Sequence, residues 1–243
     1  MEAAVPEGRS EALHRAADAP AYTVAEASRL AGLSENRTRR WLKGYEFSYP
    51  VGQSGVSVRR RQAPVIRRGR TAGTPYASFL DLIDLLFVKE FLNHGISLQK
   101  LRKALDEAGR LLGKRHFAHE SFFTSGKNIY LEVKDEGDAI MELLTGGQWV
   151  IAPIILELAH KIEFDKTTRL ARRWYPRGSD LPIVVDPSIS FGRPVLLTRG
   201  VATANVYDLF LAEGENLQVT SAWLGLAVSD ARAAITFEQQ LAA

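Results

Sequence analysis

A pair of short helices joined by a glycine turn near the N-terminus constrains the fold of this chain more than any other feature. The run TVAE at Thr23 has the form of a capping box, in which the threonine hydroxyl and the side chain of Glu26 bond each other's backbone N–H groups. Gly32 suits the left-handed conformation in which helices commonly end, and Ser34 can cap a second helix over residues 35–43. Two short helices separated by about three residues that include a glycine predict a helix-turn-helix.

The second of these helices has two faces with different chemistry. Its apolar stripe, at the spacing i, i+3, i+4 and i+7, consists of Thr38, Trp41, Leu42 and Tyr45. Its polar residues, on the opposite face or its flank, are Asn36, Arg37, Arg39, Arg40 and Lys43. We expect Trp41 to be buried against the first helix, so that the second helix presents its basic side chains rigidly to a DNA groove.

Positive charge continues beyond this helix. Between Glu35 and Leu80 the chain has ten basic residues against two acidic ones, a charge of +8; since the whole chain carries +3, the remainder carries −5. Such a block predicts binding to a polyanion, because each neutralised phosphate releases condensed counterions. A solvated, disordered arginine run is the alternative, and the apolar residues interleaved with the arginines disfavour it.

The basic segment continues with two stretches of strand character, residues 45–49 and 56–61, separated by a glycine-containing loop. This pattern predicts a hairpin wing, and Arg59, Arg60 and Arg61 lie where such a wing would contact DNA phosphates. Residues 67–75, RRGRTAGTP, are expected to form a flexible connector whose arginines can become ordered on DNA.

The rest of the chain divides into further helical and mixed segments. Helices are expected from Ser78 to Gly95, where Ser78 begins a broad apolar run, and from Ser97 to about Gly113. The middle shows β-type stretches: a hairpin turning at residues 125–128, strands at 148–151 and around Ile162, and a strand in LARRWYP. Three C-terminal helices are expected: one capped by Thr203 and ending at Gly214, one capped by Asn216 and ending at Gly225, and one over residues 229–241.

The predicted fold class is mainly α with small β elements (α+β). The expected regions are a flexible lead-in over 1–20, a winged helix-turn-helix over 21–113, a small mixed α+β region over 114–180 and a helical domain over 181–243, whose three helices suggest a helix-turn-helix-like bundle.

The first of these domains carries a resemblance to a known family. The run YTVAEASRLAGLSENRTRRWLKGY, the basic wing and the run LLFVKEFLNHGISLQKLRKAL together are similar to the winged helix-turn-helix of MerR-type regulators, over residues 21 to about 112. The resemblance implies that Ser34, Arg39 and Trp41 fill the cap, DNA-contacting and core positions of the motif. The chain departs from those regulators afterwards, because no long coiled-coil dimerisation helix and no cysteine-bearing loop follow.

The tail resembles a second known module, a small domain of unassigned function that recurs in antitoxins. The matching residues are Asp186, Pro187, the FGRP run of 191–194 and Thr203. Head, middle (GGQWV, ARRWYPRG) and tail together look like VapB-type antitoxins, which are encoded beside a PIN-like ribonuclease. That resemblance implies a DNA-binding regulator of a type II toxin–antitoxin system, which forms a homodimer, represses its own operator and neutralises the toxin.

Two alternatives stay open at this stage. Arg172 or Arg173 could insert into an acidic metal site of the toxin and block it. Alternatively, the run ARRWYPRG could be only a structural strand and turn. The chain could also be a stand-alone MerR-like transcriptional regulator whose middle region responds to a small molecule.

Several other function classes lack their signatures. His116, His119 and Glu120 form an H-x-x-H arrangement without the further ligands that zinc needs, and no phosphate loop, nucleophile elbow or paired-carboxylate signature occurs. We therefore expect no catalytic residue, metal or cofactor. The chain contains no cysteine, signal-peptide core or membrane-length apolar run, which predicts a cytoplasmic protein.

Overall fold

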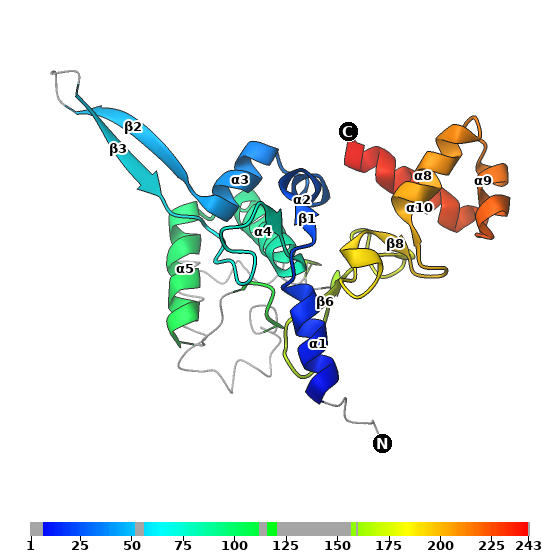
Figure 1. Cartoon of the computed structure of the whole chain (residues 1–243), viewed down its shortest axis with the longest axis horizontal. Coiled ribbons are helices and arrows are strands. Elements are labelled where there is room, and N and C mark those ends of the chain that lie inside the picture. The colour runs from blue at the N-terminus through cyan, green and yellow to red at the C-terminus, as the bar shows by residue number, and fades with distance from the viewer. Residues whose placement is uncertain (1–6, 52–55, 112–115, 121–156, 159, 243) are drawn as a thin grey trace.

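The structure is a computed structural model and describes residues 7–51, 56–111, 116–120, 157–158 and 160–242 (Figure 1). The helices are α1 (Glu7–Ala17), α2 (Val24–Ala31), α3 (Glu35–Lys43), α4 (Phe79–Asn93), α5 (Leu98–Leu111), α8 (Thr203–Ala212), α9 (Leu217–Leu224) and α10 (Val228–Ala242). The strands are β1 (Tyr22–Thr23), β2 (Tyr45–Val51), β3 (Val56–Gln62), β4 (Tyr76–Ala77), β5 (Ile162–Phe164), β6 (Ala171–Trp174), β7 (Ile183–Val184), β8 (Val195–Leu196) and β9 (Val201–Ala202). These helices and small antiparallel sheets confirm the α+β class.

Helix α4 forms the centre of the N-terminal half. It is apolar on nearly every side, which in a soluble protein requires burial all round, and its residues from Phe79 to Leu85 are buried. The Ser78 and Asp81 side chains form a capping box at its start. Helices α2 and α3 contact both each other and α4, and β1 pairs with β4, so the starts of α2 and α4 are tied together.

The hairpin β2–β3 follows α3 and confirms the expected hairpin, with Tyr45 opposite Gln62 and Val51 opposite Val56. It extends away from the rest of the chain, at the end of the molecule opposite to α8, α9 and α10 (Figure 1). Helix α2 begins with the predicted capping box, and its C-cap Gly32 has a φ of 61°. The sequence therefore determines both ends of this helix as predicted.

Residues 7–20 differ from the expected flexible lead-in. Residues 7–17 form α1, which contacts β6, and Ala17 and Asp18 are buried. The Asp18 carboxylate accepts a hydrogen bond from the backbone N–H of Arg70 at 3.2 Å. The sequence of α1 has no clear apolar stripe, so its helical state depends on contacts with residues far along the chain.

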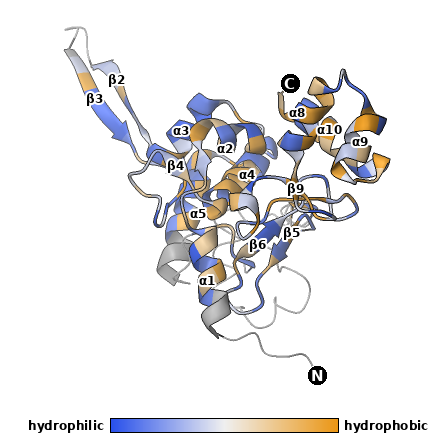
Figure 2. Cartoon of the chain, turned by 45° about the vertical axis from the view of Figure 1, so that its right-hand side comes forward, coloured by the Kyte–Doolittle hydropathy of each residue, from blue (hydrophilic) through white to orange (hydrophobic). Residues whose placement is uncertain are grey.

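The C-terminal half combines β7–β8–β9 with three helices that contact one another. Asn216 caps α9 and Gly225 ends it in the left-handed conformation, as predicted. Thr203 is not an N-cap: it is the first residue of α8, its hydroxyl donates to the Glu238 carboxylate, and Ala202 occupies the cap position. Apolar residues are prominent both on the central α4 and on α9, which lies toward the outside (Figure 2).

Two strands of the middle region are confirmed, β5 at Ile162 and β6 in LARRWYP. The expected hairpin around 125–128 and the strand at 148–151 lie outside the described residues. In the part of the chain that the structure describes, no helix combines the length and apolar character that crossing a membrane requires.

Candidate nucleic-acid interface

Helix α3 is fixed to the core through one side of its surface. Thr38, Trp41 and Leu42 are all buried, with Trp41 only 5% exposed, which confirms Trp41 as the anchor. The Trp41 carbonyl accepts hydrogen bonds from the N–H groups of Val65 (2.9 Å) and Ile66 (3.1 Å), so the chain returning from the wing is joined to α3. Tyr45, expected on the buried stripe, is 37% exposed because the helix ends at Lys43 and Tyr45 begins β2.

The opposite side of α3 keeps its positive charges in solvent. Its exposed residues are Asn36, Arg37, Arg39, Arg40 and Lys43. Arg39 forms an ion pair with Glu35 at 3.6 Å, but both side chains are more than half exposed, so a phosphate can displace the carboxylate at small cost. The Arg40 guanidinium lies 4.9 Å from the centre of the Tyr45 ring, which orients it by a cation–π contact.

Ser34 acts at the helix end rather than on the exposed face. Its Oγ accepts a hydrogen bond from the Arg37 N–H at 3.4 Å, which confirms it as the N-cap of α3. A capped N-terminus also carries the positive end of the helix dipole. The serine therefore positions the first turn of α3, where helices commonly meet phosphates.

The three arginines of the wing do not share one face. Successive side chains of a strand point to opposite sides, and partners directly opposite lie on the same side, so Arg60 shares its face with Phe47 whereas Arg61 lies beside Glu46. Arg59 lies on the second face, where it forms an ion pair with Glu46. The sequence groups these arginines as one contact. Strand geometry instead gives the wing a basic face, which carries Arg59 and Arg61, and a mixed face, which carries Arg60 and Phe47.

The mixed face of the wing carries a ladder of aromatic rings. Tyr45 and Phe47 have ring centres 5.9 Å apart, and Phe47 and Tyr49 have ring centres 6.1 Å apart. The Arg60 guanidinium lies 5.9 Å from the centre of the Tyr49 ring. Phe47 is 39% exposed, so this face offers flat apolar groups as well as charge to a bound partner.

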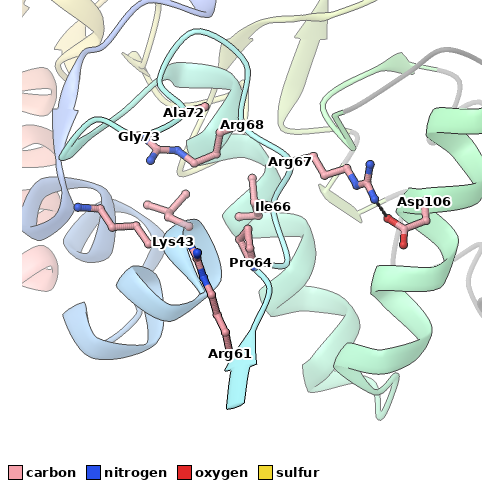
Figure 3. A pocket seen from close by; sticks show the side chains of 10 residues that line it. Lys43, Arg61, Pro64, Ile66, Arg67, Arg68, Ala72, Gly73 and Asp106 are labelled. Atoms are coloured by element: carbon pink, nitrogen blue, oxygen red, sulfur yellow. Dashed lines mark hydrogen bonds and ion pairs between the residues drawn. The ribbon is translucent and has the colours of Figure 1, made fainter. Parts of the chain in front are cut away.

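A basic cavity of about 860 Å³ lies at the base of the wing, between α3, β3, the following loop and α5 (Figure 3). Its lining residues are Leu42, Lys43, Arg61, Pro64, Ile66, Arg67, Arg68, Ala72, Gly73 and Asp106. Arg67 pairs with Asp106 on the side of the cavity formed by α5, and both side chains are more than half exposed. Within the described residues, Lys43 and Arg61 have no carboxylate partner, which leaves them available to an anion.

The loop that borders this cavity is ordered by a buried carboxylate and is not the flexible connector that the sequence predicts. Asp81 is fully buried and accepts hydrogen bonds from Arg68 Nε at 3.3 Å, from Thr71 Oγ1 at 2.5 Å and from the Ser78 N–H at 3.0 Å. The Arg68 side chain is 4% exposed and also donates to the Thr74 carbonyl. Because its charge is neutralised inside the fold, Arg68 shapes the cavity wall rather than contacting a ligand first.

His116, the first histidine of the H-x-x-H run, contacts a carboxylate of the protein itself. His116 Nδ1 lies 2.8 Å from an Asp84 carboxylate oxygen, and the other Asp84 oxygen accepts from the Ala118 N–H at 3.0 Å. Burial works to lower the pKa of His116, but the adjacent Asp84 charge outweighs it, so the pKa lies above its ordinary value. Among the described residues, no group of three or more potential ligands is placed to hold a metal ion.

Arg172 and Arg173, the candidate toxin contacts, have carboxylate partners within the chain. Arg173 Nε donates to Asp186 at 2.6 Å, and its Nη1 lies 3.3 Å from a Glu163 carboxylate oxygen. Arg172 pairs with the other Glu163 oxygen at 3.4 Å. The geometry favours the structural alternative for this run, in which the two arginines join β6 to neighbouring elements.

The sequence does not predict the exposure of two aromatic side chains in the C-terminal half. Phe191 is 87% exposed and Trp223 is 71% exposed. Residue type alone predicts burial for both, since aromatic side chains supply much of a protein's core. The FGRP run contains Phe191, but its exposure follows from a turn conformation that no local pattern specifies.

The comparisons with known proteins agree with this architecture. No family model matches the chain. The chain is 26% identical over 201 residues to "Putative antitoxin VapB45" of Mycobacterium tuberculosis (strain ATCC 25618 / H37Rv), an alignment that covers 78% of this chain and 82% of that protein. Its fold is similar to the X-ray crystal structure of Rv2018 from Mycobacterium tuberculosis, with a TM-score of 0.62 and 23% identity, over 90% of this chain and 98% of that one. At that identity the structural likeness shows a shared fold.

Proposed function

We propose that this chain is a DNA-binding, VapB-type antitoxin of a type II toxin–antitoxin system. In this proposal a homodimer represses its own operon through a MerR-like winged helix-turn-helix and neutralises a PIN-like ribonuclease toxin in the cytoplasm. The alignment with a protein named as an antitoxin, over most of both chains, supports the class. It also favours a regulatory protein without catalytic activity or cofactor.

The observation that carries the DNA-binding half is the solvent-facing basic surface of α3 above a buried Trp41. In the proposed complex α3 enters the major groove, where Asn36, Arg37 and Arg40 reach base edges or phosphates. Arg59 and Arg61 contact the backbone beside the groove, and Arg60 approaches it from the other face of the wing. In the cavity at the wing base, Lys43 and Arg61 bind one phosphate of that backbone.

The toxin-binding half is supported by exposed apolar side chains at the other end of the molecule. Leu197 and Leu211 are each 48% exposed, and Trp223 on α9 is 71% exposed. Exposed apolar side chains of this size are available for contact with a protein partner. The helices of the C-terminal half have few basic residues for a second DNA contact, since α10 carries only Arg232 and α9 carries none.

Two measurements test this proposal together. In the first, purified protein is titrated with DNA from upstream of its own reading frame and with a shuffled duplex of equal length and composition. In the second, the protein is co-expressed with the product of the adjacent reading frame, and growth and complex formation are followed. We expect protection of a palindromic site and rescue from a toxic neighbour; equal affinity for the shuffled duplex would contradict the first half, and a harmless or unbound neighbour the second.

A stand-alone regulator with a small-molecule effector is the second candidate function. One observation favours it: the cavity of about 860 Å³ is within the size range of small-ligand sites and adjoins the proposed DNA surface. The middle region in which the sequence places an effector site lies mostly outside the described residues. This candidate predicts that a small anion changes DNA affinity and that the neighbouring gene is not toxic.

A further inference from the structure

Phe191 is a large apolar side chain that the fold places in solvent. It lies at the tip of the turn between β7 and β8, and it is 87% exposed, more than any other large hydrophobic residue among those described. An aromatic ring that contributes nothing to the core leaves a substantial apolar area in water. The position therefore calls for an explanation outside the folding of the single chain.

The backbone of this turn is strained. Ser190, Phe191 and Gly192 have φ values of 48°, 56° and 78°, so three successive residues occupy the left-handed region. Only the glycine adopts that region without steric cost, because the other two residues bring Cβ close to the backbone. Such conformations persist where the surrounding structure enforces them, and they cluster at functional sites.

One of the enforcing contacts comes from the other half of the molecule. The hydroxyl of Tyr22, which lies on β1 just before α2, donates a hydrogen bond to the Gly192 carbonyl at 2.7 Å across 170 residues of sequence. A Cβ atom on residue 192 would lie 2.4 Å from that hydroxyl oxygen, so only glycine fits. Tyr22 is 2% exposed, which makes this contact a fixed part of the core.

The other end of the turn is fixed by a buried carboxylate. Asp186 is fully buried, is held by Arg173 at 2.6 Å, and accepts a hydrogen bond from the Ser188 N–H at 2.8 Å. Its backbone carbonyl accepts from the Ile189 N–H at 2.9 Å. Both ends of the turn are thus rigid, and Phe191 is held out between them in a single backbone conformation.

We infer that Phe191 is a preformed anchor that inserts into an apolar pocket of a protein partner. Rigid aromatic residues are the side chains that most often dominate the binding energy of an interface, and a preorganised backbone removes much of the entropic cost of binding. Arg193 is exposed directly after the turn, so the pocket should be bordered by carboxylates. This inference rests on the proposed function, in which that partner is the toxin.

A second copy of this chain suits the anchor poorly. The large cavity that the described residues form is bordered by Lys43 and Arg61, which have no carboxylate partner among those residues, and it would bring these two charges against Arg193. Like charges placed together in an interface oppose association. Charge complementarity therefore favours a different protein as the partner.

Phe191→Gly separates an anchoring role from a structural one. Glycine suits the positive φ, and the exposed ring leaves no packing to lose, so the thermal midpoint should stay equal or rise. The affinity for the product of the adjacent reading frame, measured by calorimetry, should fall by about tenfold or more, as for an interface hot spot. Affinity for operator DNA should not change. Tyr76→Ala, which removes an aromatic ring 47% exposed on β4, is the matched control and should retain the complex.

Each other outcome has a defined meaning. Equal affinity of wild type and Phe191→Gly for the adjacent gene product would overturn the anchor while leaving the proposed function intact. Absence of any complex with the wild type would remove the proposed function and the anchor with it. A lower thermal midpoint in Phe191→Gly would show a structural role for the ring. If the wild type is a dimer and Phe191→Gly is a monomer that still binds the toxin, the ring contacts a second copy of this chain. Either result overturns the inference.

Discussion

Helix α3 and the turn at residues 186–193 use the same kinds of side chain in opposite ways. On α3 the aromatic Trp41 is buried and the charges of Arg37 and Arg40 face solvent. In the turn the buried Asp186 is paired with Arg173 of β6, and the aromatic Phe191 faces solvent. The buried members hold the element in place, and the exposed members are available to a partner.

This contrast suggests that the two regions have partners of different chemistry. A surface of exposed arginines gains from a polyanion, whose affinity depends on salt, because counterions are released on binding. An exposed aromatic ring on a rigid turn gains binding free energy by entering a desolvated apolar pocket. The affinity of such a contact depends only weakly on salt. The wing and the C-terminal helices lie at opposite ends of the molecule, which is compatible with the proposal that each end has its own partner (Figure 1).

The largest effect on stability should come from removing the buried aromatic residue of α3, the helix proposed to bind DNA. Trp41→Ala deletes a ring that is 5% exposed, and we expect a loss of about 3–5 kcal/mol in the free energy of unfolding. Urea denaturation followed by circular dichroism measures this loss, with Phe191→Gly as the aromatic change at an exposed position. Comparable losses in the two variants would break the contrast between buried and exposed aromatic residues.

The predictable part of the molecule is the part built from local signals. The capping box at Thr23, the Ser34 cap and the terminal glycine Gly32 each act within a few residues, and the sequence specifies them directly. The wing and the burial of Trp41 follow from spacing along one element. These features account for the helix that carries the proposed DNA contacts.

The remaining features depend on contacts between distant residues. The Tyr22–Gly192 hydrogen bond and the packing of α1 on β6 have no local signature, so the sequence predicts a flexible lead-in and does not predict the exposure of Phe191. The order of residues 67–75 depends on Asp81, whose buried position is known only once α4 is in place. The division of the wing arginines between two faces is the exception, because alternation of side chains along a strand is enough to predict it from the sequence.

The next largest effect concerns charge on the DNA side. The double change Arg40→Gln and Arg61→Gln removes two exposed charges, and the slope of log affinity against log salt should become shallower by about one for each lost phosphate contact. Fluorescence anisotropy at several salt concentrations measures the slope. Arg199→Gln, a charge removed from the C-terminal half, is the matched control and should leave the slope unchanged. If it flattens the slope as much, the two regions do not differ in their partners.

A smaller effect is expected at the contact that joins the two halves. Tyr22→Phe removes the hydroxyl that holds Gly192, and we expect a loss of about 1 kcal/mol in the free energy of unfolding near neutral pH. Toxin affinity should also fall, because the turn that carries Phe191 is less rigid. Full retention of both stability and toxin affinity would show that the turn does not depend on this contact.

The pH dependence of this contact has a definite sign. Burial, followed by the nearby Glu26 and Asp186 charges, raises the pKa of Tyr22 above its ordinary value in the folded state. A raised pKa means that the contribution of Tyr22 is fully present below the unfolded pKa of about 10 and is lost as the pH rises above it. Urea midpoints of wild type and Tyr22→Phe should therefore converge in alkaline solution. A gap that widens there would contradict the assignment.

The smallest effect tests whether the cavity at the wing base receives a phosphate. Asp106→Asn frees Arg67 from its ion pair, and exposed pairs of this kind contribute about 1 kcal/mol or less, so operator affinity should rise only about two- to fivefold. Glu213→Gln, at the end of α8, removes the same charge far from the cavity and controls for net charge. A gain in Asp106→Asn alone places the phosphate next to Arg67. A loss of affinity instead would mean that the Arg67–Asp106 pair maintains the shape of the cavity, so that the DNA side, like the Phe191 turn, also relies on paired charges to position its contacts.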